Sequence, residues 1–103
     1  MSETDSSLRP FVTAAITALF APGDRETITE MLTEECNAER LYTSSKDLVE
    51  RVQLAVLKSS NGEVDKFLTA AKLAQLDWRD VLMAAGFGND VEAHLKWAGE
   101  LGK

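Results

Sequence analysis

Few residues of this chain combine a reactive side chain with a neighbour that could assist it. His94 is the only histidine, and Asp90 precedes it by four residues, a spacing that lets both side chains meet on one helix face. General acid–base catalysis would also need a nucleophile nearby, and a metal site would need further His, Cys or carboxylate ligands. The pattern favours a surface pair over an active site. We therefore predict no catalytic residue, no metal and no cofactor.

The glutamates of residues 24–36 form a second group of chemical interest. Glu26, Glu30 and Glu34 are spaced i, i+4, i+8 and fall on one face of a helix. Di-metal sites in helical bundles also take Glu-x-x-His ligands from other helices, and this sequence has no such motif. We expect a solvated acidic face, with an electrostatic docking surface for a basic partner as the alternative.

Cys36 is the only cysteine, so no intrachain disulfide can form. It follows Glu34 and Glu35, and neighbouring carboxylates raise the pKa of a thiol and make it a poorer nucleophile. We expect a half-buried residue that behaves as a small apolar side chain.

The glycines at Gly86 and Gly88 flank Phe87 and superficially suggest a phosphate loop. Such a loop follows a strand and ends in Lys followed by Ser or Thr, and neither feature is present here. A helix stop and a tight turn explain both glycines.

The segment 76–97 gathers residue types that dominate protein interfaces, Trp and Arg. Both tryptophans of the chain lie in it. Trp97 falls about 160° from Leu95 on a helical wheel, so the two cannot share a narrow buried stripe. Trp97 therefore either closes the edge of the core or faces a partner. The candidate partner-binding residues are Trp78, Arg79, Phe87, His94 and Trp97.

Residues 77–98 also allow a second interpretation, a helix-turn-helix hairpin of a DNA-binding regulator. The second helix would read the DNA, yet its early residues include Asp90 and Glu92, which repel phosphate. Residues 1–40 hold eight acidic and three basic residues, and residues 41–103 hold nine and eight, without a cluster of Lys and Arg. Nucleic acid is therefore disfavoured as a partner.

The elements that must position these residues are helices, because apolar residues recur with a helical period between turn signals. The stripe of the first helix comprises Leu8, Phe11, Val12, Ala15, Ile16, Leu19 and Phe20. The predicted helices cover about 8–20, 24–36, 44–60, 63–75, 78–85 and 90–99. The predicted N-caps are Ser6 or Ser7, Asp24, Ser44 in a capping box with Asp47, Asp77 and Asp90.

Turn and anchor residues complete this assignment. Pro10 is tolerated in the first helical turn, where its missing N–H costs nothing. Asn61 and Gly62 end the third helix, since Gly suits the left-handed position after a helix. Between the second and third helices, Leu41 and Tyr42 are the expected core anchors.

The predicted helix at about 44–60 is apolar on most sides, above all over 52–57, which is typical of a central helix with neighbours around it. A strand over 52–57 is the alternative. We reject it because no second strand is predicted to pair with it. The expected fold is all-α, a compact bundle of five or six short helices around this central apolar helix.

A length of 103 residues suits one domain, and we divide it into a disordered tail at 1–6 and a single helical domain at 7–103. The start of the chain lacks the basic and apolar regions of a secretory signal, and no apolar run is long enough to span a bilayer. We therefore expect a cytoplasmic location and no membrane partner.

The segment LDWRDVLMAAGF at 76–87 resembles the C-terminal part of small bacterial proteins of unknown function. The resemblance implies a bacterial source and carries no activity and no functional residue. The narrow apolar stripes and the apolar helix at 44–60 leave more hydrophobic surface than a small core hides. We therefore expect a non-enzymatic protein-interaction module that forms a homodimer, with the DNA-binding regulator as the alternative.

Overall fold

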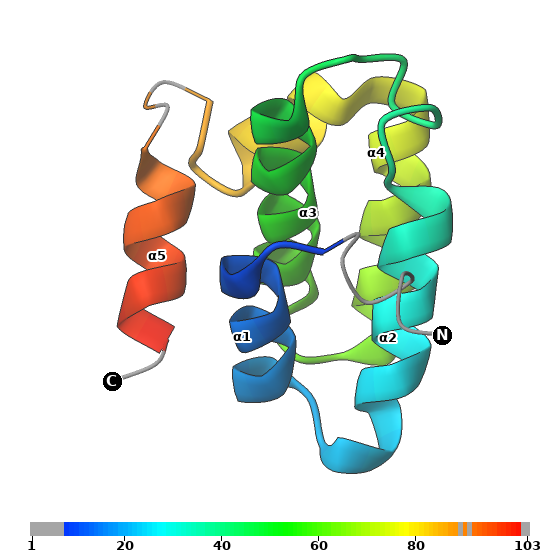
Figure 1. Cartoon of the computed structure of the whole chain (residues 1–103), viewed down its shortest axis with the longest axis vertical. Helices are drawn as coiled ribbons and strands as arrows, with labels where there is room; N and C mark the ends of the chain where they lie inside the picture. Colours follow the sequence, from blue (N-terminus) through cyan, green and yellow to red (C-terminus); the bar gives the residue numbers. More distant parts are fainter. Residues whose placement is uncertain (1–7, 89, 91, 102–103) are drawn as a thin grey trace.

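Every regular element that the structure describes is a helix (Figure 1). The structure is a computed structural model, and it describes residues 8–88, 90 and 92–101. The helices are α1 (Pro10–Leu19), α2 (Pro22–Glu35), α3 (Lys46–Ser60), α4 (Val64–Ala84) and α5 (Ala93–Leu101). The predicted all-α fold is confirmed. The predicted tail at 1–6 lies outside the described residues.

Proline starts both of the first two helices. Pro10 is the first residue of α1, as expected, and Pro22 is the first residue of α2. The predicted N-caps were wrong, because Arg9 rather than Ser6 or Ser7 precedes α1, and α2 begins before Asp24. Proline fixes the helical φ and has no N–H to satisfy, so a side-chain cap is not needed at these starts.

The apolar stripe of α1 faces the core along most of its length. Its buried members are Leu8, Val12, Ala15, Ile16 and Phe20. Phe11 is 41% exposed, and Leu19 is only partly buried against the core. The predicted stripe was therefore slightly too wide.

A serine cap starts α3, one residue later than expected. The hydroxyl of Ser45 accepts a hydrogen bond from the Leu48 N–H at 3.1 Å. The Ser45 N–H donates to Thr43 Oγ1 at 3.0 Å. The helix ends at Asn61 and Gly62, which have φ of 51° and 81°. The predicted stop is thus confirmed, with Asn61 itself in the left-handed conformation.

Helix α3 is enclosed by its neighbours. It packs against α1, α4 and α5. Every residue of 52–57 is buried, and so are the polar side chains of Glu50 and Ser60. Figure 1 shows most of α4 behind α2, with its C-terminal part crossing behind the upper end of α3, and α2 and α5 on opposite sides of the molecule. The apolar run at 52–57 suits this position, because α3 packs against three other helices.

Helix α4 is kinked at Asp77, where the backbone is extended with φ −158° and ψ 89°. The Asp77 carboxylate accepts a hydrogen bond from the Arg79 N–H at 3.1 Å, as an N-terminal cap does. The predicted helix boundary at Asp77 is therefore present as a kink. It divides α4 into a long first limb and a short second limb.

The connection from α2 to α3 corrects one core prediction. Leu41 is buried at 1% exposure, as expected, but Tyr42 is 90% exposed. Tyr42 has φ 56°, and the N–H of Thr43 donates to the carbonyl of Ala38 at 3.0 Å. This left-handed turn directs consecutive side chains to different sides, so only Leu41 reaches the core.

Helix α5 begins at Ala93 and ends at Leu101, later at both ends than expected. The Asp90 carboxylate binds the Glu92 N–H at 2.8 Å and closes a local turn before the helix. The buried residues of α5 are His94 and Ala98. Val91 lies outside the described residues.

Candidate functional site

The five candidate partner-binding residues occupy two separate groupings. Phe87 packs against His94 and Trp97, with ring centroids 6.2 Å and 6.1 Å apart. Arg79 lies over the Trp78 ring at 5.2 Å from its centroid. Phe87 and His94 are buried, whereas Arg79 is exposed and the two tryptophans are partly buried. Among these residues, only Arg79 and the tryptophans present surface to a partner.

A helix stop fixes the position of Phe87. The Phe87 N–H donates to the carbonyl of Leu82 at 2.8 Å, and the Gly86 N–H donates to that of Met83 at 3.1 Å. Gly86 has φ 81°, so this is the Schellman motif predicted from the sequence. Lys58 secures the turn from α3, because its ammonium donates to the Ala85 carbonyl at 2.8 Å and lies 5.0 Å from the Phe87 ring centroid.

His94 is enclosed rather than paired with Asp90. Its Nδ1 is buried and has no hydrogen-bond partner within the described part of the chain. Asp90 instead accepts from the Glu92 N–H, which lowers the pKa of its carboxyl, and lies 3.7 Å from the Lys96 ammonium. Among the described residues, no carboxylate is hydrogen-bonded to His94 to orient it as a general base.

Burial lowers the pKa of His94 below its ordinary value of 6.5, and the charge of Arg51 acts in the same direction. The folded state thus favours the neutral imidazole. The stability that neutral His94 contributes is complete above pH 6.5 and is lost as the pH falls below that value.

We expect the free energy of unfolding to fall between pH 7 and 5, and to fall less in His94→Leu. Urea unfolding of both proteins at each pH checks this, and equal pH slopes would contradict it.

Cys36 is fully buried, more deeply than expected. Burial first, and the charge of Glu35 second, raise the pKa of its thiol from 9.0 to about 12. The expectation of an unreactive, apolar cysteine agrees with this position.

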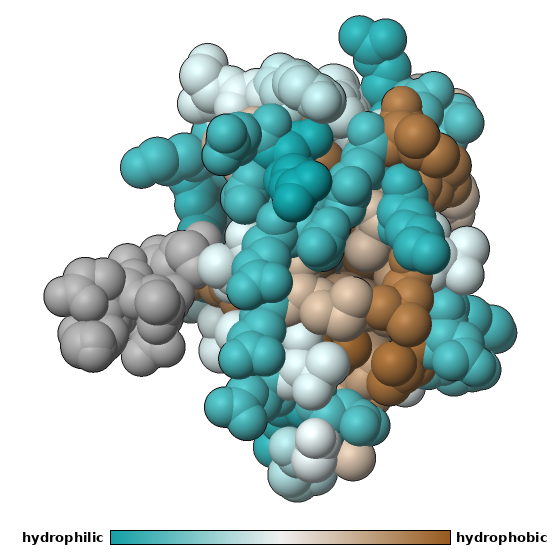
Figure 2. Space-filling model, turned by 90° about the vertical axis from the view of Figure 1, so that its right-hand side faces the viewer, coloured by the Kyte–Doolittle hydropathy of each residue, from teal (hydrophilic) through white to brown (hydrophobic). Residues whose placement is uncertain are grey.

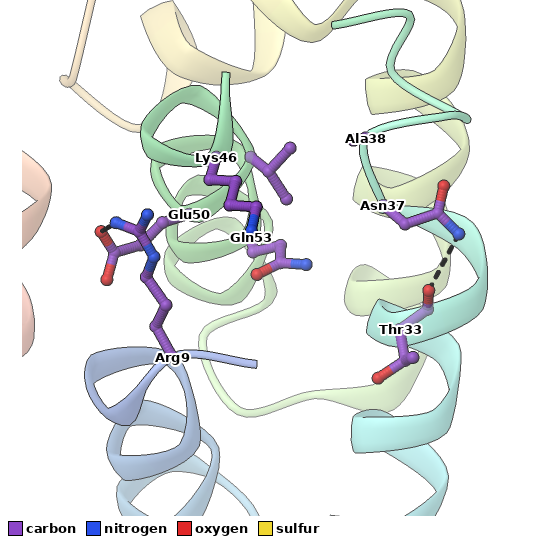
Figure 3. Close-up of a pocket in the computed structure, with 8 residues that line it drawn as sticks. Arg9, Thr33, Asn37, Ala38, Lys46, Glu50 and Gln53 are labelled. Carbon is purple, nitrogen blue, oxygen red and sulfur yellow. Dashed lines mark hydrogen bonds and ion pairs between the residues drawn. The ribbon is translucent and has the colours of Figure 1, made fainter. Parts of the chain in front are cut away.

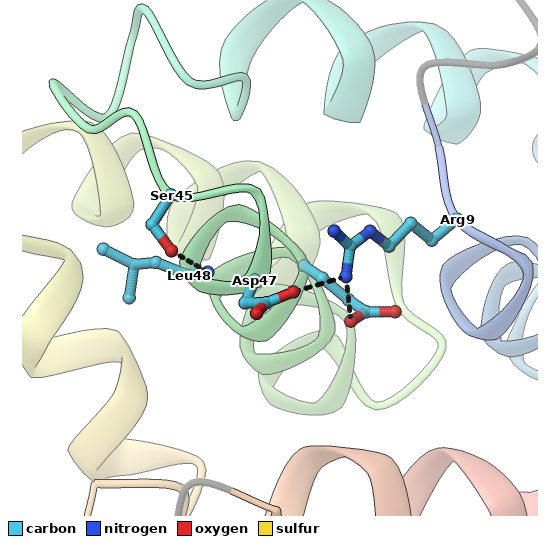
Figure 4. A network of polar contacts seen from close by, with 5 residues as sticks. Arg9, Ser45, Asp47 and Leu48 are labelled. Carbon is cyan, nitrogen blue, oxygen red and sulfur yellow. Dashed lines mark hydrogen bonds and ion pairs between the residues drawn. The ribbon is translucent and has the colours of Figure 1, made fainter.

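A polar network that the sequence analysis missed links the start of α1 to α3 (Figure 4). Arg9 Nη1 donates to Asp47 Oδ1 at 2.8 Å and to Glu50 Oε1 at 3.1 Å. The side chain of Glu50 is 8% exposed and that of Asp47 is 88% exposed. These residues are about 40 positions apart, so no local spacing could have revealed the contact.

Two cavities border this network. One, of about 430 Å³, lies where α1, α3 and α5 meet and is lined by Arg9, Glu50, Arg51 and His94 among others. The Nε of Arg51 is buried without a partner in the described residues, and another of its nitrogens donates to the Phe87 carbonyl. Ser45 and His94 both line this cavity, but the Ser45 hydroxyl bonds to the Leu48 N–H, and His94 Nδ1 has no hydrogen-bond partner among the described residues.

The larger cavity, of about 570 Å³, lies between the C-terminal part of α2 and the N-terminal part of α3 (Figure 3). Arg9 stands at one end, Asn37 lies on the α2 side, and Lys46, Glu50 and Gln53 lie on the α3 side. The Gln53 amide donates to the Cys36 carbonyl at 2.9 Å and thereby joins the two walls.

An apolar groove of about 350 Å³ follows the kink of α4. Leu73 of the first limb and Val81 and Ala84 of the second limb line it, with Asp65 and Lys66 at its edge. Leu76 continues the Leu73 side of the helix at i+3 and is 85% exposed. Figure 2, which views the side formed by α2 and α4, shows hydrophobic residues exposed on this part of the molecule.

The hairpin at 77–98 does not stand alone as a two-helix unit. Helix α5 packs against α1 and α3. The exposed residues before and at its start include Asp90 and Glu92, so the surface offered to a DNA groove would be acidic. DNA binding therefore remains the weaker prediction.

Among the described residues, no three His, Cys, Asp or Glu side chains are placed to hold a metal ion, and none of the helices has the length and hydrophobicity of a membrane span. Comparisons with protein-family models, curated proteins and solved structures gave no match. The resemblance at 76–87 thus stays a prediction.

Proposed function

We propose that this chain is a non-enzymatic protein-interaction module of a bacterial cell, and that its partner is a second copy of itself. The observation that carries the proposal is the exposed apolar surface at the kink of α4. Leu76 is 85% exposed beside a groove lined by Leu73, Val81 and Ala84. A partner that covers this leucine and the groove removes apolar surface from water, and this removal favours association.

Two features of this surface suit a second copy. The protruding side chain of Leu76 and the groove lie on the same kinked helix, so a two-fold arrangement places each Leu76 against the other copy's groove. Asp65 and Lys66 at the groove edge carry opposite charges, and a two-fold axis can bring the acid of one copy to the base of the other.

A matched pair of variants tests the location of this interface. Leu76→Glu replaces the leucine that we propose enters the groove of the other copy, whereas Met83→Glu introduces the same charge at an exposed residue outside the proposed contact. Both positions are exposed, so both variants should fold. We expect Leu76→Glu to be monomeric and Met83→Glu to remain dimeric in gel filtration with light scattering at about 50 μM, a concentration suited to a micromolar dimer. A dimeric Leu76→Glu would refute this interface.

A further inference from the structure

The cavity between α2 and α3 contains buried hydrogen-bond acceptors. Glu50 is 7% exposed, and its partner Arg9 is shared with Asp47 through a single nitrogen. Arg9 bonds only Oε1 of Glu50, and no described residue donates a hydrogen bond to Oε2. A buried carboxylate is costly unless it is paired. The cavity wall can thus accept a further positive group at Glu50.

Gln53 adds a second acceptor on the same wall. It is 3% exposed, and its amide nitrogen donates to the Cys36 carbonyl, which leaves its amide oxygen as an acceptor. Glu50 and Gln53 are three residues apart on α3 and therefore lie on one helix face. Figure 3 shows the Gln53 amide nitrogen pointing toward α2 and the amide oxygen pointing away from it.

Hydrogen-bond donors lie at the edge of the same cavity. Lys46 is exposed, and within the described residues its ammonium forms no ion pair. The side chain of Arg9 is 41% exposed at the other end. The cavity thus has acceptors in its buried wall and cationic donors at its edge, with Val49 and Ala38 as apolar lining.

We propose that this cavity binds a small zwitterion that carries an ammonium and a carboxylate group, such as a free α-amino acid. The ammonium would lie against the Glu50 carboxylate and the Gln53 amide oxygen, and the carboxylate would face Lys46 and Arg9. A volume of about 570 Å³ is within the range of small-molecule sites. The ligand ammonium would use the Glu50 oxygen that Arg9 leaves without a hydrogen bond. This site is separate from the α4 groove and does not depend on self-association.

The test uses the full chain and free amino acids, each compared with its N-acetyl and methyl-ester forms. We expect at least one free amino acid to cause saturable amide shifts in the NMR spectrum at 33–38 and 46–53. Both blocked forms should bind at least about tenfold more weakly, because each lacks one charged group (about 1.4 kcal/mol). The proposal is overturned if no amino acid gives saturable shifts at about 10 mM, if blocked forms bind equally well, or if the shifts lie on α4.

Two variants and a control assign the contacts. Glu50→Gln and Lys46→Ala should each weaken binding at least tenfold. Lys72→Ala should bind as the unchanged chain does, since Lys72 is also an exposed lysine but does not line the cavity. If Glu50→Gln fails to fold, Lys46→Ala still tests whether the cavity binds the amino acid, because Lys46 is exposed and its replacement should not disturb folding. Full affinity in Lys46→Ala, or equal loss in Lys72→Ala, would contradict the proposal.

Discussion

Replacing Phe87 with alanine should lower the free energy of unfolding by about 3–5 kcal/mol, the usual cost of removing a large buried aromatic side chain. Phe87 is 1% exposed and fills the space between Lys58 of α3 and the rings of His94 and Trp97. Its removal leaves a cavity at the point where α5 joins the rest of the molecule. Small domains are stable by only about 5–15 kcal/mol, so much of the stability would be lost.

Urea unfolding followed by circular dichroism measures this effect, and Phe11→Ala is its matched control. Phe11 is 41% exposed, so its truncation should cost about 1 kcal/mol or less. Equal stability of Phe87→Ala and the unchanged chain would mean that Phe87 does not support the core. Because Phe87 was a candidate partner-binding residue, this experiment also separates a structural role from a surface role.

Replacing Gly62 with alanine should be destabilising by about 1–3 kcal/mol, because a left-handed φ is costly for residues with a Cβ. Gly62 has φ 81°, and a Cβ there would lie 2.8 Å from the backbone carbonyl oxygen of Leu19. The connection from α3 to α4 therefore passes close against the end of α1. Neither the turn nor the carbonyl can move freely, since backbone atoms are involved on both sides.

Gly23→Ala provides the control for this substitution. Gly23 lies in the first turn of α2 with no atom within 4 Å of an added Cβ, beyond its own local chain. Alanine there should be neutral or stabilising by up to about 1 kcal/mol, because it forms helices more readily than glycine. Thermal unfolding of both variants gives the comparison. A Gly62→Ala protein as stable as Gly23→Ala would show that the close approach to Leu19 is unimportant.

The local features of the fold could be predicted from the sequence because they depend on short-range chemistry. Apolar periodicity located the helices, Asp77 marked the break in α4, and Gly86 with Phe87 marked its end. The helix starts were less accurate, since proline replaced a side-chain cap at α1 and α2. Tyr42 was misplaced because an apolar residue type does not reveal a left-handed turn.

The sites depend on tertiary structure and were largely hidden from sequence reasoning. Arg9 meets Asp47 and Glu50 only after α1 packs on α3, and the cavity beside them needs α2 as its second wall. The aromatic residues of the segment 76–97 are evident in the sequence, but the structure divides them between a cluster around the buried Phe87 and the Trp78–Arg79 pair. The exposure of Leu76 follows from the kink and was not predicted.

The central claim is that the chain self-associates through the α4 surface. Sedimentation velocity of the unchanged chain from about 1 to 100 μM tests it most directly, because this range spans the Kd of a micromolar dimer. We expect the sedimentation coefficient to rise with concentration toward that of a dimer. A single species with the mass of one 11.3 kDa chain at every concentration would contradict the claim.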